Sequence, residues 1–162
     1  MLVSLEISAA TYAEARPLFA ELDADLDERY GAGIPVQVDE ADFLAPAGAV
    51  FVARIDGSAD SDAVGCAGVR PHAPGVAELK RMYVRPGARG RGAARALLAA
   101  CEQFAIDAGY GALWLETGTA QPEALALYVS AGYRPVARFG QYAEAPDARH
   151  LGRRLPAPAS SV

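Results

Sequence analysis

The chain has 162 residues, a length that suits one domain with its own core. Hydrophobic residues make up 52% of it and charged residues 22%, as in ordinary folded proteins, and the formal net charge is −5. The acidic balance argues against broad nucleic-acid binding, and the lack of an apolar run near ~20 residues argues against insertion into a membrane.

The beginning of the chain predicts a strand followed by a long helix. Leu2–Ile7 alternates apolar and polar residues, which is typical of a strand and unlike a signal peptide. Ser8–Arg29 then carries apolar residues at helical spacing, with Thr11 as its N-cap. The pattern next predicts a short helix and two strands that form an antiparallel hairpin: 39–44, 49–55 and 63–69.

The rest of the chain predicts alternating strands and helices. A strand at Val76–Val84 leads into the strongest helix of the sequence, Gly92–Ala108, whose apolar residues share one face. The last predicted elements are a strand, a helix and two strands: 112–116, 122–131, 134–139 and 149–155. We therefore expect one mixed α/β domain over residues 1–155, followed by a disordered tail at 156–162.

The cysteines and histidines indicate no metal site. Cys66 and Cys101 lie in apolar surroundings without CxxC spacing, which is typical of buried free thiols in a reducing cytosol. His72 and His150 are far apart and have no ligand residues beside them. We therefore expect no metal cofactor and a cytoplasmic location.

A basic island lies within this acidic sequence. The segment from Lys80 to Arg95 contains six Lys or Arg residues and no acid, so it carries +6 and leaves −11 for the rest of the chain. Such an island suggests a small anionic ligand, although charge alone is better explained by a solvated face.

A glycine-rich turn joins a strand to a helix inside this island. At a helix start, backbone N–H groups lack partners and the peptide dipoles add positive charge. Glycines let a phosphate approach the backbone, and the flanking arginines add charge-assisted contacts. The P-loop motif is absent, and Gly87, Gly90 and Gly92 have the wrong spacing for GxGxxG. The turn predicts a pyrophosphate cradle, with a ligand-free turn as the alternative.

These residues resemble the GNAT N-acetyltransferase superfamily. Arg89, Gly92 and Ala94 match its signature of Gln or Arg, two residues, Gly, one residue, then Gly or Ala. The resemblance covers roughly Val76–Val136, including Ala126–Tyr133, which is similar to the family's LYxxxGF ending. It implies a mixed, mostly antiparallel sheet of six to seven strands, splayed between strands 4 and 5, with about four helices around it.

The resemblance also implies that coenzyme A lies in the gap between those two strands. Its pantetheine arm would pair with the fourth strand, because its amides imitate a peptide added at a sheet edge. The pyrophosphate would lie on the amides of the turn. The cofactor-binding residues implied are Met82, Tyr83, Val84, Arg89, Gly90, Arg91, Gly92, Ala93, Ala94 and Arg95.

Amine acylation needs a base for the amine and an acid for the departing thiolate. Glu78 is the predicted base, since some family members carry a catalytic Glu at this position. It lies four residues before Met82, so alternation places both side chains on one face unless a bulge intervenes. An exposed Glu paired with Lys80 or Arg81 is the alternative, and Glu116 is the reserve base.

Tyr128 is the predicted acid, because it matches a tyrosine that the family often carries on the helix after the fifth strand. Core packing is the alternative, since Leu125, Tyr128 and Gly132 share helical spacing. On the acceptor side, acids crowd the end of the first helix, where a solvated acidic face is favoured over an amine site: Glu21, Asp23, Asp25, Asp27 and Glu28. Phe139–Tyr142 either closes over the substrate or forms an ordinary turn.

Together these features predict an N-acetyltransferase that moves the acetyl group of acetyl-coenzyme A to a primary amine of a small molecule or protein. We expect direct transfer in a ternary complex, because neither Cys66 nor Cys101 lies in an activated setting. The alternative is a non-catalytic acyl-coenzyme A sensor. The sequence leaves the acceptor, the acyl chain and the oligomeric state, including a homodimer, open.

Overall fold

A computed structural model describes residues 4–33, 38–55 and 62–159 of the chain. Within these residues a seven-stranded sheet has the order β1-β2-β3-β4-β5-β7-β6. The strands are β1 (Leu5–Ala10), β2 (Ala49–Ile55), β3 (Ala63–Ala73), β4 (Val76–Val84), β5 (Ala112–Gly118), β6 (Arg134–Pro135) and β7 (Ala148–Arg154). The helices of the same residues are α1 (Tyr12–Tyr30), α2 (Ala93–Asp107), α3 (Pro122–Ser130) and the 3-10 helices η1 (Glu40–Phe43) and η2 (Pro86–Ala88). The predicted mixed α/β fold is confirmed.

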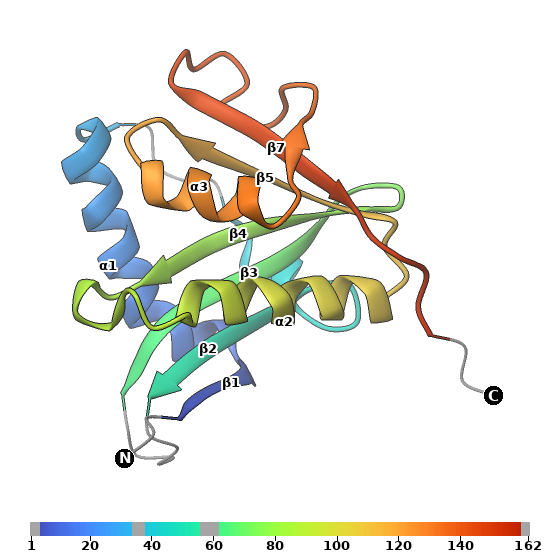
Figure 1. The fold of residues 1–162 in the computed structure, drawn as a ribbon, viewed down its shortest axis with the longest axis horizontal. Coiled ribbons are helices and arrows are strands. Elements are labelled where there is room, and N and C mark those ends of the chain that lie inside the picture. Colours follow the sequence, from blue (N-terminus) through green and yellow to red (C-terminus); the bar gives the residue numbers. More distant parts are fainter. Residues whose placement is uncertain (1–3, 34–37, 56–61, 160–162) are drawn as a thin grey trace.

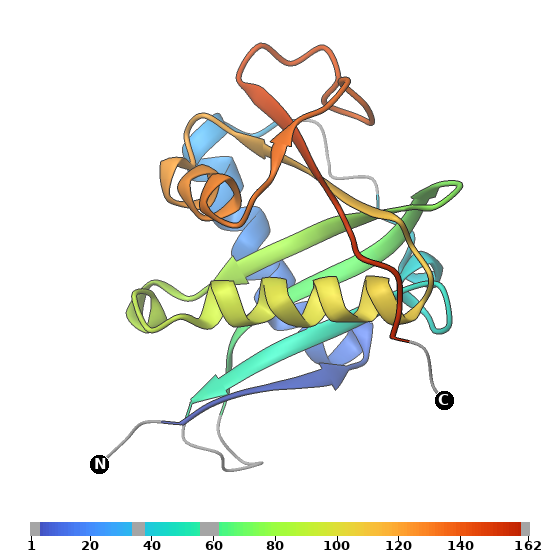
Figure 2. The same ribbon diagram turned by 45° about the vertical axis from the view of Figure 1, so that its right-hand side comes forward.

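The sheet lies between two helical layers, with α1 on one face and α2 and α3 on the other (Figures 1 and 2). The α1 face is packed by Leu18, Phe19 and Leu22 of the helix, against Val50 and Val52 of β2. The other face is packed mainly by the apolar stripe of α2: Ala93, Leu97, Leu98, Cys101 and Ala105. Burial of each large side chain contributes roughly 1.5–3 kcal/mol, so these two layers hold the sheet in place.

The sheet forks between β4 and β5. These two strands run parallel, whereas all other neighbouring strands are antiparallel. Their pairing ends at Leu79 and Leu115, although β4 continues to Val84 and β5 to Gly118. The predicted splay is therefore confirmed. Lys80 and Glu116, the first residues beyond the last pair, mark the point where the strands separate, which we call the fork.

A β-bulge interrupts β4 just beyond the fork. Cys66 of β3 pairs with Tyr83 and Gly68 pairs with Lys80, so Ala67 faces two residues of β4. One of these, Arg81, has φ of 61°, a left-handed conformation that is uncommon for a residue with a side chain. The bulge shifts the alternation of β4 by one residue from this point on.

Several predicted elements differ in extent from those observed; β3, for example, runs to Ala73 and not to 69, and β5 runs to Gly118 and not to 116. Ser8–Ala10 was expected to start the first helix but belongs to β1, because these residues pair with β2 as far as Val50; Thr11 caps α1 as predicted. The strand predicted at 134–139 is only Arg134–Pro135, because the chain then turns inward and Phe139 packs against Trp114. Residues 156–159 are exposed without regular structure, and 2, 3 and 160–162 lie outside the described residues.

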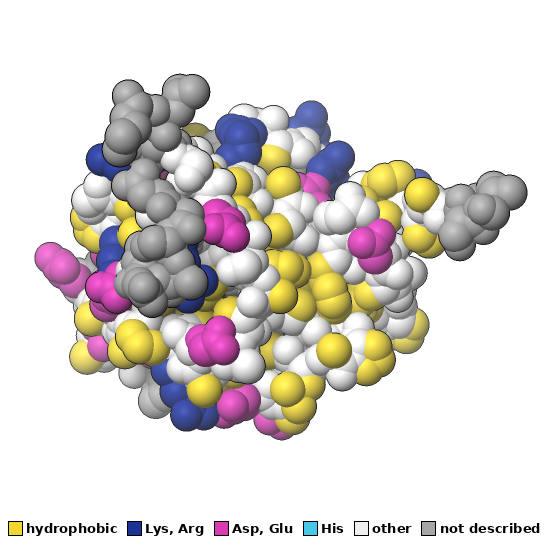
Figure 3. Space-filling view, turned by 90° about the horizontal axis from the view of Figure 1, so that it is seen from below, with side chains coloured by type: hydrophobic (Ala, Val, Ile, Leu, Met, Phe, Trp, Pro, Cys, Tyr) yellow, Lys and Arg dark blue, Asp and Glu magenta, His cyan; other side chains and the backbone are white. Residues whose placement is uncertain are grey.

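The described part of the chain contains no helix long and apolar enough to cross a bilayer. Among the same residues no group of three His, Cys, Asp or Glu side chains is placed to hold a metal ion. The face seen from below carries acidic, basic and apolar side chains interspersed (Figure 3). Two hollows of the molecule lie around the fork.

Candidate active site

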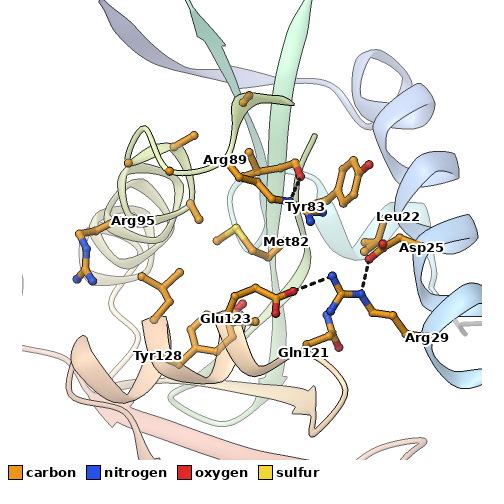
Figure 4. Close-up of a pocket in the computed structure, with 18 residues that line it drawn as sticks. Leu22, Asp25, Arg29, Met82, Tyr83, Arg89, Arg95, Gln121, Glu123 and Tyr128 are labelled. Carbon is orange, nitrogen blue, oxygen red and sulfur yellow. Dashed lines mark hydrogen bonds and ion pairs between the residues drawn. The ribbon is translucent and has the colours of Figure 1, made fainter. Parts of the chain in front are cut away.

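A cleft of about 310 Å³ opens between the end of β4, the start of α2, α3 and α1 (Figure 4). We call it the turn cleft. Its lining contains every residue predicted to bind the cofactor except Arg91, which is exposed: Met82, Tyr83, Val84, Arg89, Gly90, Gly92, Ala93, Ala94 and Arg95. The local sequence therefore located this cleft correctly.

The glycine-rich turn leaves backbone donors free at the start of α2. Gly92 is the N-cap with φ of 85° and no side-chain cap, and Gly90 is also left-handed. The first helical bond runs from the Ala96 N–H to the Gly92 carbonyl, at 3.0 Å. The N–H groups of Ala93–Arg95 consequently have no backbone partner among the described residues. A Cβ added at Gly90 or Gly92 would meet no atom within 4 Å, so the cradle is open.

The arginines around the turn are only partly held. The Arg89 Nε–H donates to the Val84 carbonyl at 2.9 Å, and its guanidinium lies 6.0 Å from the Tyr83 ring centre. The Arg95 side chain donates to the Ser130 hydroxyl at 2.9 Å. Arg89 and Arg95 therefore keep positive charge at the rim of the turn cleft, beside the free amides, and an anion is favoured there.

A second, larger cavity of about 810 Å³ lies on the α1 side of the fork. We call it the fork cavity. Its lining shares four residues with the turn cleft, so the two spaces meet there: Leu22, Met82, Gln121 and Tyr128. A molecule in one cavity can thus reach a molecule in the other beside Met82 and Tyr128.

Glu116 stands in the fork cavity as a carboxyl group with an unusual pKa. Burial raises the pKa of Glu116 to about 7, Lys80 opposes the rise, and the charges of Glu78 and Asp147 add to it. Among the described residues Glu116 forms no ion pair within 4.0 Å. A carboxyl group with this pKa exchanges protons readily near neutral pH, as a general base must.

Glu78 does not occupy the predicted position. Its side chain forms an ion pair with Arg70 of β3, Nε to Oε1 at 3.0 Å, and another with Lys80 at 3.6 Å. The residue is only 3% exposed and lines neither the turn cleft nor the fork cavity. Glu78 and Met82 do not share a face, because the bulge that the expectation allowed for is present at Arg81 and Met82 packs on the α2 side after it.

Tyr128 lies where the two cavities meet, as a catalytic acid should. It is buried, and it packs edge-on to Tyr133 with ring centres 6.0 Å apart. Burial raises the pKa of Tyr128 well above its usual range, so the phenol keeps its proton at any physiological pH. Tyr128 contributes to the core, as the packing alternative expects, and it also borders both cavities; its role as the acid stays a prediction.

The profile of the acetyltransferase (GNAT) family matches residues 9–133 of the chain. The chain belongs to this family. A curated GNAT relative, "IAA acetyltransferase" of Azospirillum brasilense, is 37% identical over 130 residues, which cover 80% of this chain and 82% of the relative. The uncharacterized N-acetyltransferase YjgM of Escherichia coli K12 is 29% identical over 134 residues, covering 81% of this chain and 72% of YjgM.

Solved structures agree with this assignment. A putative acyl-CoA N-acyltransferase from Klebsiella pneumoniae has a TM-score of 0.72 and 30% identity, covering 95% of this chain and 98% of its own. A GNAT-family acetyltransferase from Staphylococcus aureus Mu50 has a TM-score of 0.74 at 18% identity, covering 94% and 100%. The second likeness concerns the fold alone.

In the GNAT fold of this chain, α1 is tied to the far side of the fork by contacts that no pattern in the sequence predicts. Arg29 of α1 donates to the Ala120 carbonyl at 2.7 Å and pairs with Glu123 of α3 at 2.7 Å (Figure 4). The Tyr30 hydroxyl donates to the Gln121 side chain at 3.2 Å. These links connect residues about ninety positions apart, and they lie beside both cavities: Arg29 and Glu123 line the turn cleft, and Tyr30 lines the fork cavity.

The acids of α1 are mostly engaged and not simply solvated. Asp23 receives two hydrogen bonds from the buried guanidinium of Arg81, at 2.7 and 3.1 Å, and Arg81 also lies 5.0 Å from the Phe19 ring centre. Glu21 pairs with Arg85 at 2.8 Å and Asp25 with Arg29 at 3.0 Å. The face is solvated as expected, with Asp23, Asp27 and Glu28 exposed, but three of its acids also hold α1: Asp23 to the bulge, Glu21 to Arg85 after β4, and Asp25 to the last turn of α1. Tyr142, from the segment predicted either to close over the substrate or to turn, lines the fork cavity.

Proposed function

We propose that this GNAT protein is an N-acetyltransferase that uses acetyl-coenzyme A and acetylates a primary amine by direct transfer. The observation that carries the proposal is the meeting of two cavities beside Met82 and Tyr128, one ending at free helix N–H groups and the other containing Glu116. A donor bound in the first and an acceptor bound in the second come together at that junction.

The turn cleft suits coenzyme A in both charge and shape. The free amides of Ala93–Arg95 and the side chains of Arg89 and Arg95 would hold the pyrophosphate. The unpaired edge of β4 beyond the fork, at Met82–Val84, would pair with the pantetheine amides as an added strand. These are the residues that family resemblance and local sequence both indicate.

The fork cavity suits a cationic amine. Its charged lining residues are four acids and two bases: Asp23, Asp27, Glu116, Asp147, Lys80 and Arg81. Both bases are already paired, Lys80 with Glu78 and Arg81 with Asp23. The lining therefore has an excess of negative charge, which attracts an ammonium group and repels an acceptor that carries only a carboxylate.

The proposed chemistry uses two side chains. Acetyl-coenzyme A supplies an activated thioester, whose C–S bond breaks as the C–N bond to the amine forms. We assign the base to Glu116 instead of Glu78, because Glu116 faces the cavity and has a pKa near neutrality. Glu116 takes a proton from the amine, and Tyr128 gives its hydroxyl proton to the departing sulfur.

The test is release of free thiol from acetyl-coenzyme A with a panel of diamines, polyamines, lysine peptides and amino acids. We expect release that depends on the amine, with cationic amines preferred, and acetylated amine detected by mass spectrometry. Saturable cofactor binding without turnover on any amine would favour the sensor alternative. A protein that neither binds acetyl-coenzyme A nor releases thiol contradicts the proposal.

Ala94→Glu is expected to weaken acetyl-coenzyme A binding by about tenfold or more, because it places a carboxylate in the anion cradle. An acid in the first helical turn does not harm the helix, since it complements the dipole, so the protein stays folded. Calorimetric titration measures the change. The exposed Ala99→Glu on the same helix is the matched control and should bind normally; equal affinities for both variants would argue against the cradle.

Direct transfer predicts that neither cysteine carries the acetyl group. Cys66 and Cys101 are free and fully buried; burial raises the pKa of Cys66 to about 12 and that of Cys101 further still. Intact-protein mass spectrometry after incubation with acetyl-coenzyme A, without amine, should show no acetylated enzyme. Cys66→Ala should keep kcat within about twofold. An acetyl group on either thiol would contradict direct transfer.

A further inference from the structure

A row of charged side chains crosses the sheet beneath the fork cavity. Arg70 of β3 lies opposite Glu78 of β4 in the ladder, and their side chains are paired at 3.0 Å. The second oxygen of Glu78 lies 3.6 Å from the Lys80 ammonium. Lys80 and Glu116 both line the fork cavity at the fork. The row therefore runs from a partly buried arginine to the carboxyl group at which we place the base.

Two carboxylates, those of Glu78 and Glu116, compete for the Lys80 ammonium. Its side chain is 14% exposed, so its ammonium lies largely out of solvent and needs a counter-charge. Glu78, whose side chain is 5% exposed, supplies that counter-charge. In the described residues no ion pair joins Lys80 to Glu116, although Lys80 acts electrostatically on that carboxyl group.

We infer that Glu78 is a positioning residue that holds the Lys80 ammonium away from Glu116, so that Glu116 stays free to take the amine proton. The inference rests on the proposed function of the site. In this role Glu78 acts through Lys80 and does not touch the substrate. Arg70 supports this role, because it fixes Glu78 from the opposite side at 3.0 Å.

The titratable and charged groups around Glu116 come from β4, from the loop before β7, from β7 itself and from three tyrosines that interact with it: Tyr30 of α1, Tyr128 of α3 and Tyr142. Burial raises the pKa of each tyrosine, so these three phenols add no charge near pH 7. Glu78 and Lys80 lie on β4, and Asp147 precedes β7. On β7, His150 is the ladder partner of Glu116, and its ring is buried. Burial, then the charge of Arg138, lowers the pKa of His150, so its ring is neutral near pH 7 and adds no charge to the row.

The sign of each substitution follows from this geometry. Glu78→Gln removes a negative neighbour of Glu116 and releases the Lys80 ammonium toward it, and both changes favour the ionised form of Glu116. The acid limb of the kcat–pH profile should therefore move to lower pH by at least about half a unit, while the plateau falls less than about tenfold. Lys80→Met removes a positive neighbour and should move the limb to higher pH.

The experiment follows the Glu116 carboxyl group directly as well as kinetically. The carboxyl carbon of Glu116 is titrated by NMR in protein labelled with ¹³C-glutamate, assigned by its absence in Glu116→Gln, for the wild type, Glu78→Gln and Lys80→Met. This readout needs no turnover, so it tests the inference even if the proposed activity fails. Opposite shifts in the two variants are expected in both the titration and the kinetics.

Glu102→Gln is the matched control. Glu102 is also a poorly exposed glutamate paired with an arginine, Arg153, but it lies on α2 away from the fork cavity. Its loss should leave the titration of Glu116 unchanged. The inference is overturned if Glu78→Gln leaves that titration unmoved, or if it abolishes turnover at every pH while Glu116 still titrates normally. If Glu78→Gln does not fold, Lys80→Met is a sufficient test by itself. A Glu116 titration that stays unchanged or moves to lower pH in Lys80→Met overturns the inference.

Discussion

Glu116→Gln should lower kcat by about 10²-fold or more at neutral pH and remove the acid limb of the pH profile. The amide has nearly the shape of the carboxyl group but cannot accept the amine proton. Because burial raises the pKa of Glu116 to about 7, the wild-type carboxyl group is protonated below that pH, and wild-type kcat should rise as pH passes through about 7. Initial rates of thiol release between pH 5 and 9 measure both effects.

Asp147→Asn is the comparison for this variant. Asp147 also lines the fork cavity and acts on Glu116, but it is exposed and has no place in the proton transfer. It should keep the acid limb, shifted to lower pH, with a kcat within a few-fold of the wild type. If Glu116→Gln keeps wild-type kcat and an unchanged limb, Glu116 has no part in catalysis.

Tyr128→Phe should lower kcat by about tenfold to a hundredfold with little change in KM for the amine. The phenyl ring preserves the packing against Tyr133 and the core, so only the proton for the departing sulfur is lost. Burial keeps the pKa of this phenol high, and the acid is therefore present in the wild type across the whole working range of pH. Steady-state kinetics at several amine concentrations separate the two parameters.

Tyr133→Phe tests whether the effect is specific. Tyr133 touches Tyr128 and is more deeply buried, and its hydroxyl has no hydrogen-bond partner among the described residues. Removing an unsatisfied hydroxyl should leave stability equal or slightly raised and kcat unchanged. Equal loss of kcat in both variants would mean that Tyr128 acts only through packing.

The donor side of the site was predictable because it is local in the sequence. The free amides, the left-handed glycines and the arginines all lie between Arg89 and Arg95, so a strand, a turn and a helix suffice to bring them together. Strand and helix periods identify such a unit without knowledge of the rest of the fold. Of the predicted residues, Arg91 alone does not line the cleft.

Which glutamate faces the fork cavity could not be predicted from the sequence, because it depends on a change of register. Strict alternation along β4 puts Glu78 and Met82 on one face, and the bulge at Arg81 separates them. One signal was present: Lys80 and Arg81 are two consecutive polar residues between Leu79 and Met82, which breaks the alternation where the bulge occurs. Glu116 faces the fork cavity because it lies just beyond the last β4–β5 pair, and no local sequence pattern marks where that pairing ends.

The acceptor side depends on contacts between distant segments. Arg81 meets Asp23 across 58 positions, and Arg29 meets Ala120 across 91. No periodic pattern encodes such pairs, and the acids of α1 alone could not be distinguished from a solvated face. Only the packing of α1 across the fork shows which of these acids form ion pairs with arginines. It also shows which acids, such as Asp27, line the cavity without such a pair.

A crystal structure of this protein grown with acetyl-coenzyme A would test most directly whether the forked sheet is a donor site. It should show the pantetheine arm along Met82–Val84, the pyrophosphate on the amides of Ala93–Arg95, and the thioester beside Tyr128 with the fork cavity open toward Glu116. A ligand bound at another surface, or β4 and β5 paired past Leu79 and Leu115 with the gap closed, would contradict it.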